Sequence, residues 1–362
     1  LAAGAAAADA QRFDTEDGPV LVEAVAGPFD EPWGFAFLPE PGAMLVTEIG
    51  GDLRLVRDGR ISAPLAGVPR VVARGQGGLL DVAVAPDFAE TQTIYLTYSE
   101  PADGGARTAL ATARLETGAT PRLTDLRVVF RQQPAFPTTR HFGSRIVFDS
   151  AGHVFVTLGD RARREIVPRL DNHLGKVVRL NRDGSVPADN PFVGRRDALP
   201  EIYSFGHRNA QGAALRPSDG AYFTISHGAA GGDEVNRPIA GANFGWPEVS
   251  YGRNYSGAPF PAASRADVIE PLYYWDPSIA PSGAAFYDGD LFPAWRGDLF
   301  VGALRGQHIA RLELDGDRIV GEERLFEFAF GRVRDVRSGP DGALWFAIDD
   351  ANGFVYRVTP AR

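Results

Sequence analysis

Six segments of the chain alternate apolar and polar residues on both sides of a short turn that is rich in proline, aspartate and glycine. In "GSRIVFDSAGHVFVTLGD", residues 143–160, the alternation has the period of two that places successive side chains on opposite faces of a β-strand. Each segment is therefore predicted to form a β-hairpin. The segments begin near positions 33, 78, 143, 211, 282 and 333.

The spacing of these hairpins, roughly 45 to 70 residues, gives each repeat room for four strands and their loops. We predict an all-β fold, a six-bladed β-propeller of four-stranded antiparallel blades, because a recurring hairpin suits radial repetition better than two stacked sheets. Segment 161–180 is expected to be mostly loop with a short helical turn. The longest insertions between hairpins, 161–200 and 229–281, could build a site.

The composition and the N-terminal sequence restrict location and partners. Residues 13–362 are expected to form a single catalytic domain, and residues 1–12 an export-signal remnant or a disordered N-terminus, because "LAAGAAAADA" is similar to the end of such a signal. We therefore expect a periplasmic or secreted protein. A formal net charge of −9 argues against nucleic-acid partners, and no apolar run is long enough for membrane insertion. Cysteine is absent, so any cofactor is held without sulfur.

Pairing about the turns predicts which side chains share one end of the propeller. Folding the third hairpin about Ala151 places His141 opposite Asp160. Folding the fourth hairpin in the same way places Arg208 and Asn209 opposite residues 227–229. All of these residues lie just before a first strand or just after a second strand.

The last two hairpins bring more arginines to the same edge. Arg305 is expected opposite Ser282, and Arg332 and Arg334 are expected at the level of Asp349 and Ala347. In a propeller these edges meet around one mouth of the channel. The residues predicted to gather there are Gln76, His141, Arg208, Asn209, Arg305, Arg332 and Arg334.

Four guanidinium groups at one mouth repel one another unless an anion lies between them. A polyanionic ligand is therefore one interpretation of this mouth. The alternative is that Arg332 and Arg334 form ordinary salt bridges with Asp335 or Asp349.

His141 has a possible partner across its hairpin. A carboxylate such as Asp160 orients an imidazole and raises its basicity, which makes His141 a candidate general base. A structural histidine is the alternative. His153, in the turn, is expected to be solvated, and His173 and His308 have no comparable setting.

The segment "GAAGGDEVNRPIAGANFGWP", residues 228–247, combines exposed backbone carbonyls with two acidic residues, Asp233 and Glu234. Hard oxygen ligands of this kind suit calcium. The spacing is not that of an EF-hand, and a turn-rich loop with a solvated acidic pair is the alternative.

From about residue 27 onward the chain resembles the soluble quinoprotein sugar dehydrogenases that use pyrroloquinoline quinone (PQQ), and among them the aldose sugar dehydrogenases. The resemblance rests on the His141 hairpin and on an ordered set of other motifs: "GQGGLLDVAVAPDF", "HLGKVVRLNRDGSVPADNPF", "EIYSFGHRNAQG", "GGDEVNRPIAGANFGWPEVSYGRNYSG" and "RVRDVRSGPDGALW". It implies a six-bladed propeller, which the hairpin count predicts independently.

The resemblance also implies roles for individual residues. His141 is implied as the general base, with Asp160 as its partner, and Arg208 as the group that polarises the quinone carbonyl together with calcium. The carbonyls of Gly228 and Ala229 are implied to hold this catalytic calcium. The residues implied around PQQ are Gln76, His141, Arg208, Asn209, Tyr255, Arg305, Arg332 and Arg334.

Glu234 and the backbone near Phe244 are implied to form a second, structural calcium site. The sequence departs from the family pattern at three positions: Ala229 replaces a frequent proline, Phe244 replaces tyrosine, and Arg305 replaces lysine. The first two supply backbone oxygens, so the side chain matters little there. Lys176 is the only lysine of the chain, which makes Arg305 an unsurprising exchange.

The function implied is PQQ- and calcium-dependent oxidation of aldose sugars at the anomeric carbon to lactones, by hydride transfer to the quinone, with electrons passed to an external acceptor. Two alternatives stay open. A calcium-dependent lactonase would need several acidic residues at the mouth, whereas this mouth is rich in arginine. A non-catalytic binding propeller would leave the predicted pair of His141 and Asp160 without a role.

Overall fold

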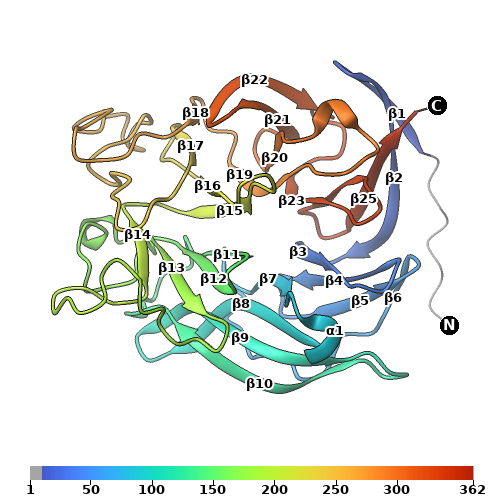
Figure 1. The fold of residues 1–362 in the computed structure, drawn as a ribbon, viewed down its shortest axis with the longest axis horizontal. Coiled ribbons are helices and arrows are strands. Elements are labelled where there is room, and N and C mark those ends of the chain that lie inside the picture. The colour runs from blue at the N-terminus through green and yellow to red at the C-terminus, as the bar shows by residue number, and fades with distance from the viewer. Residues whose placement is uncertain (1–9, 362) are drawn as a thin grey trace.

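The computed structural model describes residues 10–361 as six antiparallel sheets arranged in a ring (Figure 1). Each innermost strand contacts the innermost strands of both neighbouring sheets, in the order β3, β7, β11, β15, β19, β23 and back to β3. The predicted six-bladed β-propeller is confirmed.

The first three blades each contain four strands. In order along the chain, their strands are β3 (Pro32–Phe37), β4 (Ala43–Glu48), β5 (Leu53–Arg57) and β6 (Arg60–Ile61); β7 (Leu79–Val84), β8 (Thr93–Ala102), β9 (Gly105–Glu116) and β10 (Arg122–Arg131); and β11 (Gly143–Phe148), β12 (His153–Leu158), β13 (Lys176–Asn181) and β14 (Ile202–Phe205).

The last three blades include the one that closes the ring. Their strands are β15 (Ala210–Leu215), β16 (Tyr222–Ser226), β17 (Asp233–Asn236) and β18 (Tyr273–Trp275); β19 (Pro281–Phe286), β20 (Leu299–Ala303), β21 (His308–Asp315) and β22 (Arg318–Leu325); and β23 (Val333–Ser338), β24 (Leu344–Ile348), β25 (Gly353–Pro360), β2 (Gly18–Phe29) and β1 (Gln11–Thr15).

In the described part of the chain, helical structure is confined to three short segments. These are the α-helix α1 (Phe88–Thr91) and two 3-10 turns, Arg164–Ile166 and Pro293–Trp295. The loop and helical turn predicted for 161–180 are present, but β13 already begins at Lys176. The six predicted hairpins form the two innermost strands of the six blades.

The N-terminal part of the chain closes the ring. Strand β2 pairs with β25, and Val22 lies opposite Val358. Strand β1 adds a fifth strand to this last blade, one more than the predicted four. Of the predicted leader, residues 1–9 lie outside the described part of the chain, whereas Gln11 and Arg12 belong to β1.

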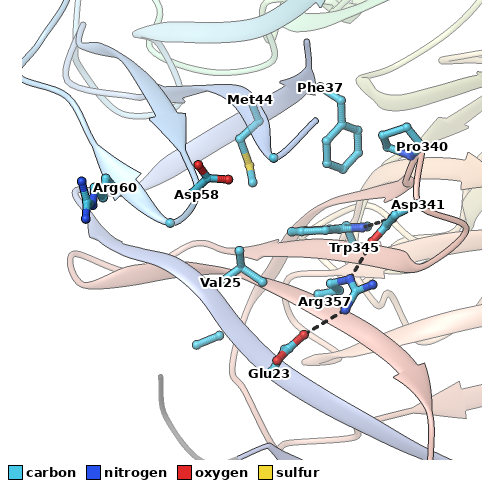
Figure 2. Close-up of a pocket in the computed structure, with 13 residues that line it drawn as sticks. Glu23, Val25, Phe37, Met44, Asp58, Arg60, Pro340, Asp341, Trp345 and Arg357 are labelled. Atoms are coloured by element: carbon cyan, nitrogen blue, oxygen red, sulfur yellow. Dashed lines mark hydrogen bonds and ion pairs between the residues drawn. The ribbon is translucent and has the colours of Figure 1, made fainter. Parts of the chain in front are cut away.

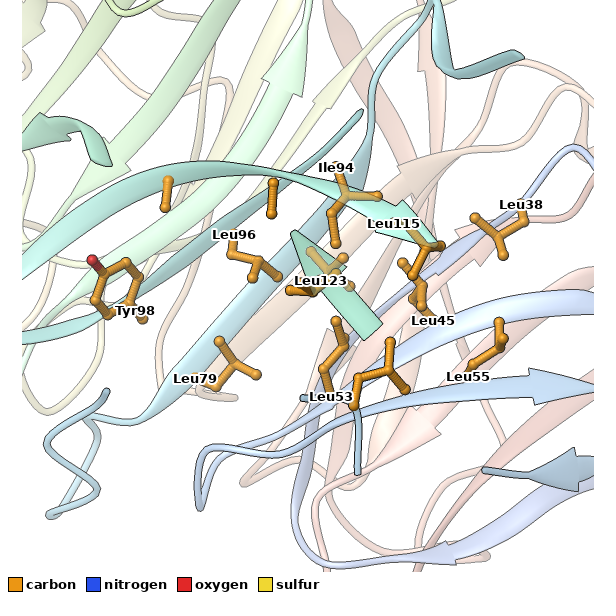
Figure 3. Packing of buried hydrophobic residues seen from close by; sticks show 14 of the residues in the cluster. Leu38, Leu45, Leu53, Leu55, Leu79, Ile94, Leu96, Tyr98, Leu115 and Leu123 are labelled. Carbon is orange, nitrogen blue, oxygen red and sulfur yellow. The ribbon is translucent and has the colours of Figure 1, made fainter. Parts of the chain in front are cut away.

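The interfaces between blades are apolar. Between the first two blades, leucines from β4, β5, β7 and β8 interdigitate (Figure 3), and Leu45, Leu53, Leu79 and Leu96 have no exposed surface. Burying each such side chain contributes roughly 1.5–3 kcal/mol. The pattern of apolar positions therefore fixes the faces on which neighbouring blades meet.

A threonine in the second strand joins each of three blades to the next. Thr47 Oγ1 accepts a hydrogen bond from the Gly34 N–H (3.0 Å) and donates one to the Leu80 carbonyl of the next blade (2.6 Å). Thr97 and Thr157 repeat the arrangement at 2.7 and 2.8 Å. Every innermost strand contains a β-bulge, and these threonine bonds lie beside it. The bonds therefore fix the position of the strand ends at the mouth.

The predicted position of Arg305 is wrong by three residues. Pro281 pairs with Ala303, and the Arg305 N–H bonds to the Ile279 carbonyl at 3.0 Å, so Ser282 is not its neighbour. The bulge adds a residue to β19 and the following connection contains a 3-10 turn, neither of which alternation alone reveals. Arg305 still lies at the same end of the blade.

Four charged side chains form a network where the innermost strands of three blades meet. Arg145 Nη1 lies 2.8 Å from Asp81 Oδ1 and 3.1 Å from Asp335 Oδ1, and Arg337 contacts the same two carboxylates at 3.1 Å. Asp81 and Asp335 are fully buried. Each buried charge here therefore depends on its partners.

Asp81→Ala should reduce the free energy of unfolding by about 3–5 kcal/mol, because it leaves the buried guanidinium of Arg145 and the partly buried one of Arg337 short of a counter-ion. Urea denaturation of the variant measures this loss. Asp103→Ala, at an exposed turn, is the control and should change stability by less than about 0.5 kcal/mol. Equal free energies of unfolding for the two variants would show that the network does not make this contribution to stability.

Candidate active site

A pocket of about 200 Å³ opens at the mouth predicted from the hairpins. It is built by the ends of β11 and β12, by the start of the fourth blade, and by the two long insertions. It brings together five of the predicted residues. Its lining residues are Arg140, His141, Asp160, Ala162, Arg164, Arg208, Ala229, Trp246, Asn254 and Tyr255.

His141 and Asp160 form a close pair in this pocket. His141 Nδ1 lies 2.6 Å from Asp160 Oδ1, as the predicted hairpin register requires. Burial lowers the pKa of His141 below its usual value, against the opposing effect of Asp160, and the nearby Arg208 and Arg140 lower it further. The imidazole is therefore neutral at pH 7. Because an ionised carboxylate only accepts, Nδ1 carries the proton and Nε2 is free to accept one.

Asp160 is held by three donors. Besides His141, Trp246 Nε1 donates to Oδ2 (2.9 Å) and the Ala162 N–H donates to Oδ1 (2.8 Å). Burial alone would raise the pKa of Asp160, but the hydrogen bond and charge of His141, together with Arg208, outweigh it and lower the pKa. The carboxylate is therefore ionised and fixed in orientation.

The backbone of His141 is held in a left-handed conformation, with φ of 56°. Its N–H donates to Gln76 Oε1 at 2.7 Å, so Gln76 positions the histidine. Gly159 makes this path possible, since a Cβ there would lie 1.9 Å from the His141 carbonyl oxygen. Gln76 is predicted to lie at the mouth. In the structure its side chain lies there and contacts the backbone of His141.

Arg208 lines the side of the pocket next to His141. Its Nη2 donates to the Tyr255 hydroxyl (3.1 Å), its Nη1 to the His227 carbonyl (3.3 Å), and its guanidinium lies 5.4 Å from the centre of the Trp246 ring. The backbone of Arg208 also accepts the Asp160 N–H at 2.8 Å, which joins the third and fourth blades. Tyr255 itself is 76% exposed and forms the rim.

Asn209 and Arg305 are among the predicted mouth residues that do not line this pocket. Asn209 is 1% exposed and its Oδ1 accepts the Gly143 N–H at 3.0 Å, so in this structure it supports the third hairpin. Arg305 is exposed at the end of β20. His227 lies beside Arg208, and burial lowers its pKa well below the usual value.

Arg332 and Arg334 share one carboxylate. Arg332 Nη2 and Arg334 Nη2 each lie 2.8 Å from Asp349 Oδ2, so the predicted salt bridge to Asp349 is present. Asp335 instead belongs to the buried charge network. Two cations facing one anion leave a net positive charge at the mouth, so this salt bridge is compatible with a further anion.

The predicted metal loop brings backbone oxygens together. A Cβ on Gly228 would lie 2.1 Å from the Gly231 carbonyl oxygen, so only glycine fits this approach. The Ala229 carbonyl accepts the Arg253 N–H at 3.1 Å. Asp233 is fully buried, and its two oxygens accept from the Gly228 N–H (2.8 Å) and from Ser278 Oγ (2.7 Å), so it is not part of the solvated acidic pair of the alternative.

Glu234 has a different setting from Asp233. Although part of the residue reaches solvent, protein surrounds its carboxyl, and this burial raises the pKa to about 7 despite a hydrogen bond from Asn236 (2.9 Å). Asn236 Oδ1 is buried and has no partner among the described residues. Phe244, the other predicted contributor, is buried and its ring stacks on His207. Within residues 10–361, no cluster of three or more acidic or histidine side chains forms a metal site.

A larger pocket lies elsewhere, at the opposite end of the strands between the first and last blades. It has a volume of about 610 Å³ and an apolar lining that includes Phe37, Met44 and Trp345 (Figure 2). Three of its charged residues pair with one another, and Figure 2 shows Arg357 joined to both Glu23 and Asp341. None of the predicted residues lies there.

Sequence reasoning missed Trp246 and Gln211. Trp246 lies within the glycine-rich segment, where the glycines and acidic residues suggest a metal site. Its indole N–H instead donates to Asp160, which lies 86 positions away in the sequence. Gln211 Oε1 accepts from Arg334 Nη1 at 3.0 Å. Only the ring of blades brings these residues together, and no spacing in the sequence signals the contacts.

Comparison with known proteins agrees with this arrangement. Residues 29–357 match the family described as Glucose / Sorbosone dehydrogenase. The chain belongs to this family. The predicted resemblance to the soluble quinoprotein sugar dehydrogenases is thereby confirmed, and a sugar dehydrogenase is favoured over the lactonase and the binding propeller. Within residues 10–361, no helix is long and apolar enough to cross a membrane.

Two relatives illustrate the range of the family. The chain is 45% identical over 346 residues to aldose sugar dehydrogenase YliI of Escherichia coli, covering 94% of this chain and 93% of that one. It is 26% identical over 369 residues to quinoprotein glucose dehydrogenase B of Acinetobacter calcoaceticus, covering 80% and 77%.

Solved structures show the same fold. The apo form of the E. coli soluble aldose sugar dehydrogenase superposes with a TM-score of 0.91 at 44% identity, covering 94% of this chain and all of that one. The PQQ-bound aldose sugar dehydrogenase of Streptomyces coelicolor gives a TM-score of 0.79 at 26% identity, covering 94% and 98%.

Asp160→Asn should lower the pKa of His141 further, because the carboxylate is the group that opposes the effect of burial on the imidazole. An NMR titration of the His141 ring measures this change. Asp149→Asn is the matched control, since it removes the carboxylate partner of His153 and should leave His141 unchanged. A raised pKa of His141 in Asp160→Asn would contradict the assignment.

Proposed function

We propose that this protein oxidises aldose sugars at the anomeric carbon to lactones, with PQQ and calcium as cofactors, and passes the electrons to an external acceptor. The observation that carries the proposal is the neutral His141, paired with ionised Asp160 beside Arg208 in a pocket at the propeller mouth. Residues 13–362, together with Gln11 and Arg12 of β1, would act as one catalytic domain. We further propose that the protein is periplasmic or secreted, as its N-terminal sequence suggests.

The residues at the mouth suit an anionic cofactor such as PQQ. Arg332 and Arg334 share a single carboxylate, and the buried Nε of Arg334 has no partner among the described residues. A ligand carboxylate would supply the missing acceptor. Gln76, Asn209, Tyr255 and Arg305 would complete the cofactor site, as the family resemblance implies.

His141 would act as the general base. Its Nδ1–H bond to Asp160 leaves Nε2 to accept the proton of the sugar's anomeric hydroxyl. Asp160 would stabilise the imidazolium that forms and hold the ring in place. Arg208, next to the pair, would bind and polarise a carbonyl oxygen there.

The bound quinone would supply a two-electron acceptor that takes the hydride from the anomeric carbon. With the proton held on His141, loss of hydride from a cyclic hemiacetal leaves a lactone. This chemistry fits the site, because the base His141 and the cation Arg208 lie side by side in a pocket at the propeller mouth.

Calcium would be held by oxygens in two places. The carbonyls of Gly228 and Ala229 would hold the catalytic ion, in a loop where backbone oxygens crowd around glycine. Glu234 and the carbonyl of Phe244 would hold the structural ion. The unpartnered buried oxygen of Asn236 beside Glu234 supports a cation at this second place.

His141→Gln should keep PQQ binding while kcat falls by about 10²–10⁴, the usual contribution of a general base. The activity of the unmodified enzyme should fall as pH drops through the pKa of His141, which burial places below 6.5. Steady-state dye reduction with an aldose measures both. A variant with near-native kcat and full cofactor would place the base elsewhere.

Removal of calcium with a chelator should lower the melting temperature, because an ion bound only by the folded protein stabilises it by linkage. In Glu234→Gln the effect of the chelator should be much smaller. Glu248→Gln, at an exposed ion pair, is the control and should respond like the unmodified protein. Identical melting of the unmodified protein with and without calcium would refute the structural site.

A further inference from the structure

The two arginines that share Asp349 are held very differently. Arg334 is 7% exposed and its Nη1 donates to Gln211 of the fourth blade at 3.0 Å. Its guanidinium also lies 5.9 Å from the ring centre of Trp33 of the first blade. Contacts from two other blades therefore fix Arg334 independently of Asp349.

Arg332 has much weaker support. Its side chain is 49% exposed, and among the described residues its guanidinium bonds only to Asp349, through Nε at 2.9 Å and Nη2 at 2.8 Å. An exposed arginine loses considerable side-chain entropy when it is held in one rotamer. Asp349 is thus the group that keeps Arg332 beside Arg334.

Asp349 is itself well placed for this task. Its side chain is 12% exposed, and its backbone N–H donates to the Arg332 carbonyl at 2.8 Å across the last hairpin. One oxygen, Oδ2, accepts from both guanidinium groups. The hairpin register therefore sets the carboxylate opposite Arg332, and the bulge in β23 brings Arg334 to the same oxygen.

We propose that Asp349 is a positioning residue that holds the exposed Arg332 against the buried Arg334, so that the pair is preorganised for an anionic group of the ligand. This inference rests on the proposed function insofar as PQQ is that ligand. The inference adds Asp349, which would not contact the cofactor but would determine how Arg332 binds it.

The proposal predicts the opposite sign from simple electrostatics. Replacing Asp349 by asparagine makes the mouth more positive by one charge, so a counter-ion role alone would raise the affinity for an anion. A positioning role instead lowers the affinity, because ordering Arg332 then costs binding free energy. The direction of the change therefore separates the two.

The test is titration of PQQ into calcium-loaded apoprotein, followed by the quinone absorbance. Asp349→Asn should weaken binding by about fivefold or more, and Asp349→Glu should restore most of the loss. In a double-mutant cycle, Asp349→Asn should have little further effect once Arg332 is glutamine. A general loss of structure would not produce this coupling.

Asp350→Asn is the matched control. Asp350 lines the same surface pocket as Arg332 and Asp349, and its Oδ1 accepts only the Asn352 N–H in the structure. The variant makes the same change in charge, and PQQ binding should be equal or slightly tighter. Tighter binding in Asp349→Asn, or additive effects with Arg332→Gln, would overturn the proposal.

If the unmodified protein binds no PQQ, the proposed function fails, and Asp349 is then tested with sulfate. Sulfate should raise the melting temperature of the unmodified apoprotein more than that of Asp349→Asn or Arg332→Gln. An equal rise in all three would refute the positioning role independently of the cofactor.

Discussion

The mouth of the propeller depends on one buried carboxylate, Asp160. Its side chain takes hydrogen bonds from His141, from the indole of Trp246 and from the Ala162 N–H, and its backbone N–H reaches the Arg208 carbonyl. A buried anion is costly unless such donors surround it, so the same bonds that make Asp160 tolerable also fix the imidazole and the two insertions. Stability and chemistry thus share one set of contacts.

Charge is arranged at two levels along the propeller axis. Deeper in the ring, Arg145 and Arg337 are matched by two buried aspartates, so this layer is balanced and structural. At the mouth, two arginines share Asp349, and Arg208 pairs with no carboxylate of residues 10–361, so positive charge is in excess. The propeller thus has a positively charged mouth that suits an anion, next to a deeper layer in which the charges balance, although the chain as a whole is acidic.

The insertions convert this scaffold into a site. The loop that follows β12 contributes the residues beside Asp160, and the loop between β17 and β18 contributes Trp246 and Tyr255. Tyr255 is exposed at the rim, whereas Trp246 is buried against Asp160. The loops therefore have an anchored part that supports the base and an open part that a substrate can reach, which is the usual division of labour in sites built on loops.

The sequence alone determined the hairpins, their number and the register of His141 with Asp160, because alternation and turns are local and a hairpin pairs symmetrically about its turn. It also identified the family through its ordered motifs. The tertiary structure decided the rest. The bulge and 3-10 turn that displaced Arg305 from Ser282 depend on packing between blades, and the indole that bonds Asp160 comes from a different blade. Contacts between distant segments follow from the closed ring, which no local pattern encodes.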